Sequence, residues 1–488
     1  MSKRVVPYGS WPSPLSAARV TAGALRLDQI QLDGDDVYWI EGRASEGGRN
    51  VIVKRSASGH IEDVTPPEFN VRSRVHEYGG AAYTVDRGTV YFSNFADQRI
   101  YRQQKDRAPV AITDAGPCFA DYRADISRDR LIAVREMHLA GSEAKNDIVA
   151  IGTPTGVPTV TLSEGADFYS DPIVSPDGKF LAWLQWHHPN MPWDGTELWV
   201  AAFNPDGKPG VREKVAGGAA ESIFQPEWSP DNALYFVSDR TGWWNLYRWR
   251  GVDVESVHEM AAEFGKPQWT FSMSTYAFVT ANRIAATYVQ DGRWQLAMID
   301  MDLHRFEPVA LPLQPVESIK ATSDAIYFIG ASATEAPAIV ELDPRSRRTS
   351  IIRSSATSPI ARDWISVPEA VTFTAAGREV HAFYYPPANP EVEAPTGARP
   401  PMLVITHGGP TGATSDVLDP KIQFWTSRGF AVLDVNYSGS TGYGRPYRDR
   451  LKGQWGIVDV ADVIDVAKEM VVLGKADADR LIIRGSSA

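Results

Sequence analysis

The chain has 488 residues, 43% hydrophobic and 22% charged, so it is too long for one ordinary domain and can bury a sizeable core. Its net charge of −11 disfavours nucleic acid or an anionic membrane surface as the partner and suits small or cationic ligands. The single cysteine, Cys118, excludes an intrachain disulfide and a thiolate metal cluster, so we expect a reducing, cytoplasmic compartment.

The N-terminal segment, residues 1–23, has no apolar run of the kind that a secretory signal contains. No window of the chain approaches eighteen consecutive apolar residues, so the sequence predicts no membrane span. We expect this segment to pack on the C-terminal domain.

Residues 24–360 contain seven short runs rich in β-branched and aromatic residues. The runs start at Val37, Val90, Leu131, Phe180, Leu234, Ile284 and Ile326. Their mean spacing of about 48 residues is the size of a four-stranded propeller blade. Turn sequences such as "SPDGK" (175–179) favour antiparallel strands within each unit. The sequence therefore predicts a seven-bladed β-propeller, with an open array of β-sandwiches as the alternative.

Residues 361–488 follow a different pattern, introduced by a Pro-rich loop at 384–401. Apolar runs at 402–410 and 430–444 are typical of buried parallel strands. Helical patterns at 415–429 and 459–474 alternate with them, and a last apolar run ends the chain. This alternation predicts a doubly wound α/β domain.

The final stretch, "RGSSA", holds four of the five positions of the Gly-x-Ser-x-Gly turn that presents a nucleophilic serine. We expect Ser487 to be the nucleophile; Ser486 is the alternative, but it lacks a glycine two residues before it. A developing oxyanion needs two N–H donors. The predicted donors are the backbone N–H of Ala488 and that of Gly409 in the glycine-rich loop "THGGPTG" (406–412).

Several motifs resemble the prolyl oligopeptidase family of serine peptidases. They are "HGGPTG", "VNYSGSTGYG" (435–444), "WGIVDVADV" (455–463) and the terminal "GSSA", which stand in the family's order. The stretches "NVRSRVHEYGGAAY" (70–83) and "YGSWPSPLSA" (8–17) resemble the acylaminoacyl-peptidase and dipeptidyl-aminopeptidase branch. The resemblance implies a β-propeller followed by an α/β-hydrolase domain, with activity on short peptides at or near the N-terminus and no metal or cofactor.

The triad acid and histidine of α/β-hydrolases follow the serine in chain order, so the resemblance places both beyond Ala488. We expect the hydrolase domain to be incomplete here, with its remainder carried further along the gene or by a second polypeptide. A non-catalytic propeller scaffold with a degenerate hydrolase domain and an esterase of the same fold are the alternatives. A homo-oligomer is left open.

The resemblance also suggests which side chains select the substrate. Glu77 is the first candidate to bind the substrate's α-amino group, followed by Glu136, Glu197 and Glu227. Arg72 and Arg74 could hold a carboxylate, although pairing with Glu77 is the expected use. The loop "WHHPNMPWDG" (186–195) is expected to line the propeller mouth rather than to bind a metal.

In the C-terminal domain, a substrate pocket is predicted where loops follow the strands. Its candidate residues are His407, Tyr437, Tyr443 and Trp455, with core packing as the alternative for the last three. Asp459 and Asp462 are interpreted as residues of a helix's first turn, favourable to its dipole, and not as triad acids.

Overall fold

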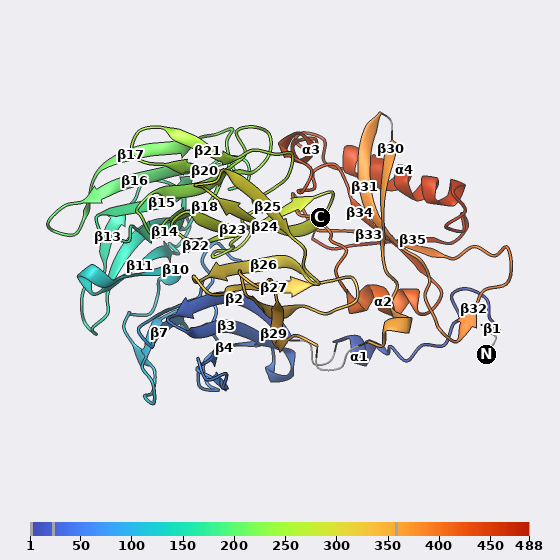
Figure 1. The fold of residues 1–488 in the computed structure, drawn as a ribbon, viewed down its shortest axis with the longest axis horizontal. Helices are drawn as coiled ribbons and strands as arrows, with labels where there is room; N and C mark the ends of the chain where they lie inside the picture. Colours follow the sequence, from blue (N-terminus) through green and yellow to red (C-terminus); the bar gives the residue numbers. More distant parts are fainter. Residues whose placement is uncertain (1–2, 22–24, 357–359, 376, 488) are drawn as a thin grey trace.

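The fold is that of a computed structural model, which describes residues 3–21, 25–356, 360–375 and 377–487. Figure 1 shows two parts: a ring of blades, coloured blue to yellow, and an α/β part in orange and red. The described residues include no helix long and apolar enough to cross a membrane.

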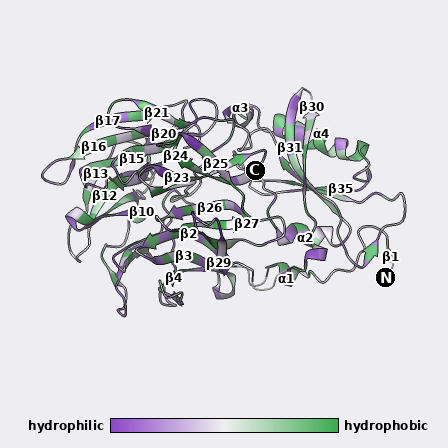
Figure 2. Cartoon of the chain, in the orientation of Figure 1, coloured by the Kyte–Doolittle hydropathy of each residue, from purple (hydrophilic) through white to green (hydrophobic). Residues whose placement is uncertain are grey.

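The ring is a seven-bladed β-propeller, which confirms the prediction from the repeats. Each blade is a four-stranded antiparallel sheet whose strands pair in chain order. The seven apolar runs of the sequence form the second strand of each blade, which is buried between the first and the third. Figure 2 shows hydrophobic (green) and hydrophilic (purple) residues interleaved along the strands of the ring.

The strands of blades 1 to 4 have the following bounds: β2 (Leu25–Asp33), β3 (Asp36–Arg43), β4 (Arg49–Arg55), β5 (Ile61–Asp63); β6 (Tyr83–Asp86), β7 (Thr89–Ser93), β8 (Ile100–Gln103), β9 (Val110–Ala111); β10 (Cys118–Asp125), β11 (Arg130–Met137), β12 (Lys145–Gly152), β13 (Val160–Ser163); β14 (Phe168–Val174), β15 (Phe180–Trp186), β16 (Glu197–Phe203), β17 (Pro209–Gly217).

Blades 5 to 7 follow: β18 (Ile223–Trp228), β19 (Leu234–Ser238), β20 (Asn245–Trp249), β21 (Val254–His258); β22 (Tyr276–Thr280), β23 (Arg283–Gln290), β24 (Arg293–Asp300), β25 (Arg305–Val309); β26 (Gln314–Ala321), β27 (Ile326–Ala331), β28 (Ala338–Leu342), β29 (Thr349–Ser354). Short 3₁₀ turns lie at Ala44–Glu46, Ile126–Arg128 and Arg362–Trp364.

The α/β part is built on a five-stranded sheet in the order β30-β31-β34-β33-β35. Its strands are β30 (Glu369–Ala375), β31 (Arg378–Tyr385), β33 (Met402–Thr406), β34 (Ala431–Asn436) and β35 (Leu481–Gly485). β33 pairs in parallel with both β34 and β35, which gives the predicted hydrolase-type core. β30 and β31 are antiparallel additions.

Three helices accompany this sheet: α2 (Pro420–Thr426), α3 (Arg445–Asp449) and α4 (Val458–Val472). α2 begins where the Asp419 side chain accepts a hydrogen bond from the Lys421 N–H, with Pro420 at the first helical position. α4 buries Val463, Val466 and Met470 against the sheet. The predicted helices are thus present, but α2 is shorter than the pattern at 415–429.

The described part of the N-terminal segment lies against the α/β part. β1 (Arg4–Val5) pairs in parallel with β32 (Val392–Glu393), and α1 (Ala17–Thr21) follows. Gly429 leaves room for Trp11, because a Cβ at Gly429 would lie 2.9 Å from the indole ring. The domain boundaries at 23/24 and 360/361 stay predictions, since 22–24 and 357–359 lie outside the described residues.

Polar contacts join the two parts over blades 5 to 7. Buried Asp239 of blade 5 pairs with Arg445 and Arg448 of α3, at 2.7 and 2.6 Å. Near blade 7, Asp416 accepts a 2.7 Å hydrogen bond from Gln314. Between them, Trp269 Nε1 donates to the carbonyl oxygen of Thr411 (2.9 Å). The α/β part therefore covers one face of the propeller ring.

Candidate active site

Ser487 lies two residues after the end of β35, in the segment where the sequence predicts the nucleophile turn. The register pairs Gly485 with Thr406 of β33, and a Cβ at Gly485 would lie 2.5 Å from Thr406 Oγ1, so a larger residue does not fit. Ser487 itself has a φ of 56°, a left-handed conformation that is uncommon for residues other than glycine. This is the strained geometry expected of a turn that presents a nucleophile.

The glycine-rich loop after β33 packs directly on this turn. The N–H of Gly409 donates a 2.9 Å hydrogen bond to the carbonyl oxygen of Ser487. A Cβ at Gly408 would lie 3.0 Å from the carbonyl oxygens of Ser486 and Ser487. Gly409 can serve an oxyanion only if its N–H exchanges this backbone partner for the substrate. Ala488, the other predicted donor, lies outside the described residues.

His407 is a structural residue of this loop and not a general base. Its Nδ1 lies 2.8 Å from the carbonyl oxygen of Gly408, which can only accept, so Nδ1 carries the proton. Its Nε2 therefore accepts from the hydroxyl of Ser440 at 2.7 Å. Burial lowers the pKa of His407, and the Gly408 hydrogen bond opposes this shift. The neutral ring fixes the shape of the loop.

Tyr437 and Trp455 flank the loop, whereas Tyr443 does not. Tyr437 stacks on the His407 ring and donates to the His407 carbonyl at 3.0 Å; burial raises its pKa to about 12. A Cβ at Gly409 would lie 2.8 Å from the half-exposed Trp455 ring. Tyr443 stacks on His381 and faces Gly292 of the propeller instead. Of the three predicted pocket aromatics, Tyr437 and Trp455 adjoin Gly409 and Tyr443 does not.

Among the described residues, none forms a hydrogen bond with Ser487 Oγ, so no described imidazole activates this hydroxyl.

Asp462, interpreted from sequence as a residue favourable to the helix dipole, is fully buried in α4. It accepts from the Ser438 N–H (2.9 Å) and pairs with Arg378 (2.9 Å). Its role is to hold the loop after β34.

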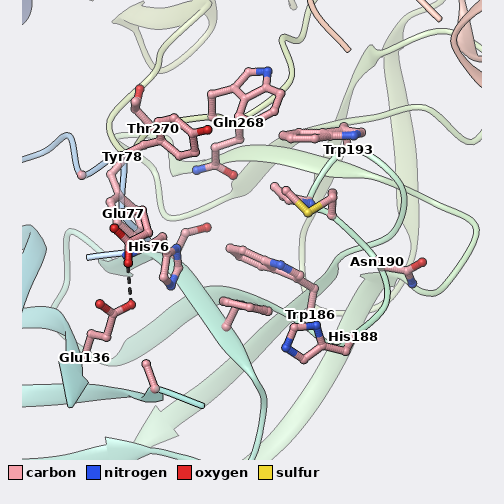
Figure 3. A pocket seen from close by; sticks show the side chains of 18 of the residues that line it. His76, Glu77, Tyr78, Glu136, Trp186, His188, Asn190, Trp193, Gln268 and Thr270 are labelled. Atoms are coloured by element: carbon pink, nitrogen blue, oxygen red, sulfur yellow. Dashed lines mark hydrogen bonds between the residues drawn. The ribbon is translucent and has the colours of Figure 1, made fainter. Parts of the chain in front are cut away.

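A cavity of about 270 Å³ opens in the propeller close to the glycine-rich loop that follows β33. Figure 3 shows Glu77, Tyr78 and Glu136 on one side of it and Trp186, Asn190 and Trp193 on the other. Its other lining residues include Phe168, His188, Met191 and Trp269. The segment 186–193 thus lines the cavity, while His187 lies 3.3 Å from Asp167 outside it.

Glu136 holds the turn that carries Glu77. Its Oε2 accepts from the backbone N–H of His76 at 2.9 Å, and its Oε1 lies 2.8 Å from His138 Nε2. Burial raises the pKa of Glu136, against these two contacts. Burial lowers the pKa of the His76 imidazole to about 3, so the ring is neutral. One oxygen of Glu136 thus accepts from the His76 N–H, and the other lies beside His138.

Glu77 is exposed and has a φ of 65°, next to His76 with a φ of 53°. Its N–H is held by the Arg74 carbonyl at 2.9 Å. Within the described residues, no basic nitrogen lies within 4 Å of its carboxylate, so the expected pairing with Arg72 or Arg74 is absent. A carboxylate fixed at a cavity mouth without a cation is suited to bind an ammonium group.

The remaining acidic candidates lie elsewhere. Glu197 is on β16, 3.4 Å from Lys214, and Glu227 is on the innermost strand of blade 5, near Arg123.

The sequence did not single out Trp269, yet this residue joins the cavity to the glycine-rich loop that follows β33. It lies 4.4 Å from Trp193 between ring centroids and binds Thr411, two residues after Gly409. Nothing in its flanking residues distinguishes it from a core tryptophan.

Comparisons with known proteins agree with the fold. A model of the prolyl oligopeptidase family matches residues 417–488. A solved structure of a puromycin-hydrolysing peptidase from Mycobacterium tuberculosis aligns with a TM-score of 0.95 at 38% identity, over 99% of this chain and 77% of that one. A crystal structure of puromycin hydrolase gives 0.93 and 35%, with the same coverage.

Dipeptidyl aminopeptidase BIII of Pseudoxanthomonas mexicana is 26% identical over 315 residues, which make up 60% of this chain and 45% of that protein. The human acylamino-acid-releasing enzyme is 34% identical over 122 residues, 25% of this chain and 16% of that protein. The chain spans less than half of the length of the curated relatives that it matches.

Proposed function

Since the chain belongs to the prolyl oligopeptidase family, we propose that the protein is a serine peptidase that cleaves short peptides at or near a free N-terminus. One observation carries this proposal: a single loop touches both the nucleophile turn and the acidic, aromatic cavity. Gly409 binds the carbonyl of Ser487, and Thr411 binds Trp269. A substrate held in the cavity is thereby close to the serine.

In the proposed reaction, Ser487 Oγ attacks the scissile carbonyl and forms an acyl-enzyme, which water then hydrolyses. The N–H groups of Gly409 and Ala488 stabilise the oxyanion. The histidine that takes the serine proton and gives it to the leaving amine, and the acid that orients this histidine, come from residues after Ala488 or from a second polypeptide. This acyl transfer needs no cofactor. The single buried cysteine, Cys118, supports placing the protein in the cytoplasm.

The cavity favours an amino-terminal residue with an aromatic or large apolar side chain. Glu77 supplies the negative charge for the α-ammonium group, and Trp186, Trp193 and Trp269 supply apolar faces. Puromycin, named for two of the relatives, is itself an aromatic amino acid amide with a free amino group. It therefore belongs among the first compounds to test.

The test uses protein expressed from the complete gene. A fluorophosphonate probe should label the wild type and Ser486→Ala but not Ser487→Ala, and hydrolysis of phenylalanyl p-nitroanilide should disappear with the label. Labelling that persists in Ser487→Ala contradicts the assignment. Faster cleavage of the N-acetylated substrate favours an acylaminoacyl peptidase, and cleavage of esters alone favours an esterase. No labelling in any variant favours the scaffold.

A further inference from the structure

A second cavity, of about 400 Å³, lies beside the acidic one in blades 1 and 2. The two cavities share Tyr78, Thr270 and Phe271. Gly80 pairs with Phe271 in a parallel bridge, and the Phe271 N–H donates to the Gly79 carbonyl at 3.0 Å. A Cβ at Gly80 would lie 2.7 Å from the Phe271 backbone, so the wall between the cavities is closely packed main chain.

This wall is also the part of the propeller that touches the loop beside the nucleophile. Trp269, which binds the Thr411 carbonyl, directly precedes Thr270 and Phe271. Tyr78 packs edge-on against Trp269 at 5.5 Å between ring centroids. A peptide that crosses this wall, with one end in each cavity, therefore has its middle next to the glycine-rich loop beside Ser487.

Arg26 on β2 supplies one positive charge to the second cavity. Its Nη2 donates to Asn50 Oδ1 at 3.2 Å, and a Cβ at Gly42 would lie 3.2 Å from its Nε. The guanidinium is thus aligned along the backbone of β3. Of the carboxylates in the described residues, none lies within 4 Å of it; Asp28, which also lines the cavity, is near enough to be affected by its charge.

Arg72, which also lines this cavity, carries the second positive charge. Its guanidinium stacks on the Phe95 ring at 4.7 Å, and the backbone N–H of Arg72 donates to the Ser93 carbonyl at 3.1 Å. As with Arg26, no carboxylate of the described residues lies within 4 Å. Arg74 stacks on the same ring at 4.6 Å but does not line the cavity.

The lining of the second cavity includes several residues with little or no side chain. Six of its seventeen lining residues are glycine or alanine: Gly42, Ala44, Gly48, Gly80, Ala81 and Ala82. The neighbouring cavity, by contrast, has large aromatic walls and the Glu77 carboxylate. One cavity is thus acidic and aromatic, and the other has two arginines against one carboxylate, that of Asp28.

We infer that the second cavity binds the C-terminal carboxylate of a short peptide through Arg26 and Arg72, while the first binds its amino end. Planar guanidinium groups recognise carboxylates bidentately. The inference rests on the proposed function and adds a substrate class: peptides of a few residues with a free C-terminus, about 10 Å long for an extended tripeptide.

The test compares phenylalanyl-glycyl-glycine with its C-terminal amide, using protein from the complete gene. We expect the wild type to have at least a tenfold lower KM for the free acid. Arg72→Gln and Arg26→Gln should each reduce this ratio about tenfold, with little change in kcat. Arg74→Gln is the matched control, because it loses the same stacking contact without changing the cavity, and should keep the wild-type ratio.

Equal KM values for acid and amide in the wild type would overturn the inference, as would equal changes in Arg72→Gln and Arg74→Gln. Phenylalanyl p-nitroanilide has no carboxylate, so its hydrolysis distinguishes failure of the second-cavity inference from failure of the proposed function. If wild-type protein cleaves the anilide but ignores the carboxylate, only the second site is wrong. If it cleaves neither, calorimetric binding of the tripeptide acid and amide to Ser487→Ala decides the second site alone.

Discussion

The backbone N–H of Gly409 lies 2.9 Å from the carbonyl oxygen of Ser487, and this contact holds the glycine-rich loop against the proposed nucleophile turn. The Trp455 ring restricts the space for a side chain at position 409, because a Cβ there would lie 2.8 Å from it. Loop and turn are therefore expected to move as one unit.

The first prediction concerns Gly409→Val. The added side chain should displace the loop and its N–H, so kcat/KM should fall by about 10² or more, as on loss of an oxyanion donor. Steady-state kinetics on phenylalanyl p-nitroanilide measures this. Gly412→Ala is the control, since its Cβ would be at least 3.4 Å from any neighbour. A folded Gly409→Val enzyme with wild-type turnover would remove Gly409 from the site.

The second prediction concerns Glu77→Gln. Loss of a charge-assisted hydrogen bond of about 1.5–3 kcal/mol should raise KM for a free aminoacyl anilide by roughly ten- to a hundredfold. The KM for the N-acetylated substrate should hardly change. Glu143→Gln removes another carboxylate from the same cavity lining and controls for net charge. Equal effects of Glu77→Gln on both substrates would assign Glu77 a structural role.

Much of the fold could be predicted because its signals are local. The run beginning at Val37, like those at Phe180 and Ile326, is a buried second strand, and such strands must be apolar whatever surrounds them. The antiparallel pairing of β31 with β34 was not predicted, because these strands are far apart in sequence and nothing in Ala382 or Val435 marks its partner. Pairing partners distant in sequence are not encoded in periodicity.

The site divides in the same way. The turn at Ser487 follows from glycine spacing, a local steric requirement. The cavity does not, because Tyr78, Trp186 and Trp269 come from three separate blades and meet only when the ring closes. The sequence predicts that Arg72 pairs with Glu77, but the guanidinium of Arg72 stacks on the ring of Phe95 instead.

The third prediction concerns the contact between the domains at Asp239. Arg448 is 3% exposed in its side chain, stacks on Trp244 and has no described partner for its Nε and Nη1, so Asp239 is its main counter-charge. Asp239→Asn should leave this charge unpaired and destabilise the closed arrangement by about 3 kcal/mol. Small-angle scattering should show an increased radius of gyration, and thermal unfolding should begin earlier.

Asp449→Asn is the matched control for Asp239→Asn. Asp449 is paired with Arg445 at 3.3 Å within α3, and its side chain is 33% exposed. Such a pair contributes only about 0.3–0.5 kcal/mol, so its loss should leave the radius of gyration unchanged. If Asp239→Asn behaves like Asp449→Asn, the domains are held together elsewhere.

The last prediction concerns pH and the neighbouring Glu263, which is 1% exposed. Its oxygens accept from the N–H groups of Trp244 (2.8 Å) and Gly444 (3.0 Å), and so link the two parts. Burial raises its pKa from 4.5 to about 7, against the attraction of Arg448 and with a smaller contribution from Asp239. The folded protein therefore holds this proton more tightly than the unfolded chain does.

The stability contributed by the protonated form is fully present below about pH 4.5 and is lost as pH rises through about 7. A shift of this size corresponds to roughly 3 kcal/mol. Urea unfolding at pH 5 and pH 8.5 should thus show the wild type losing about this much stability relative to Glu263→Gln, whose amide does not titrate. The comparison with Glu263→Gln removes the contributions of other titrating groups, including Asp121 and Asp434, whose pKa values burial also raises to about 7. A difference between the two proteins that is the same at both pH values would show that Glu263 is ionised throughout, with Arg448 outweighing its burial.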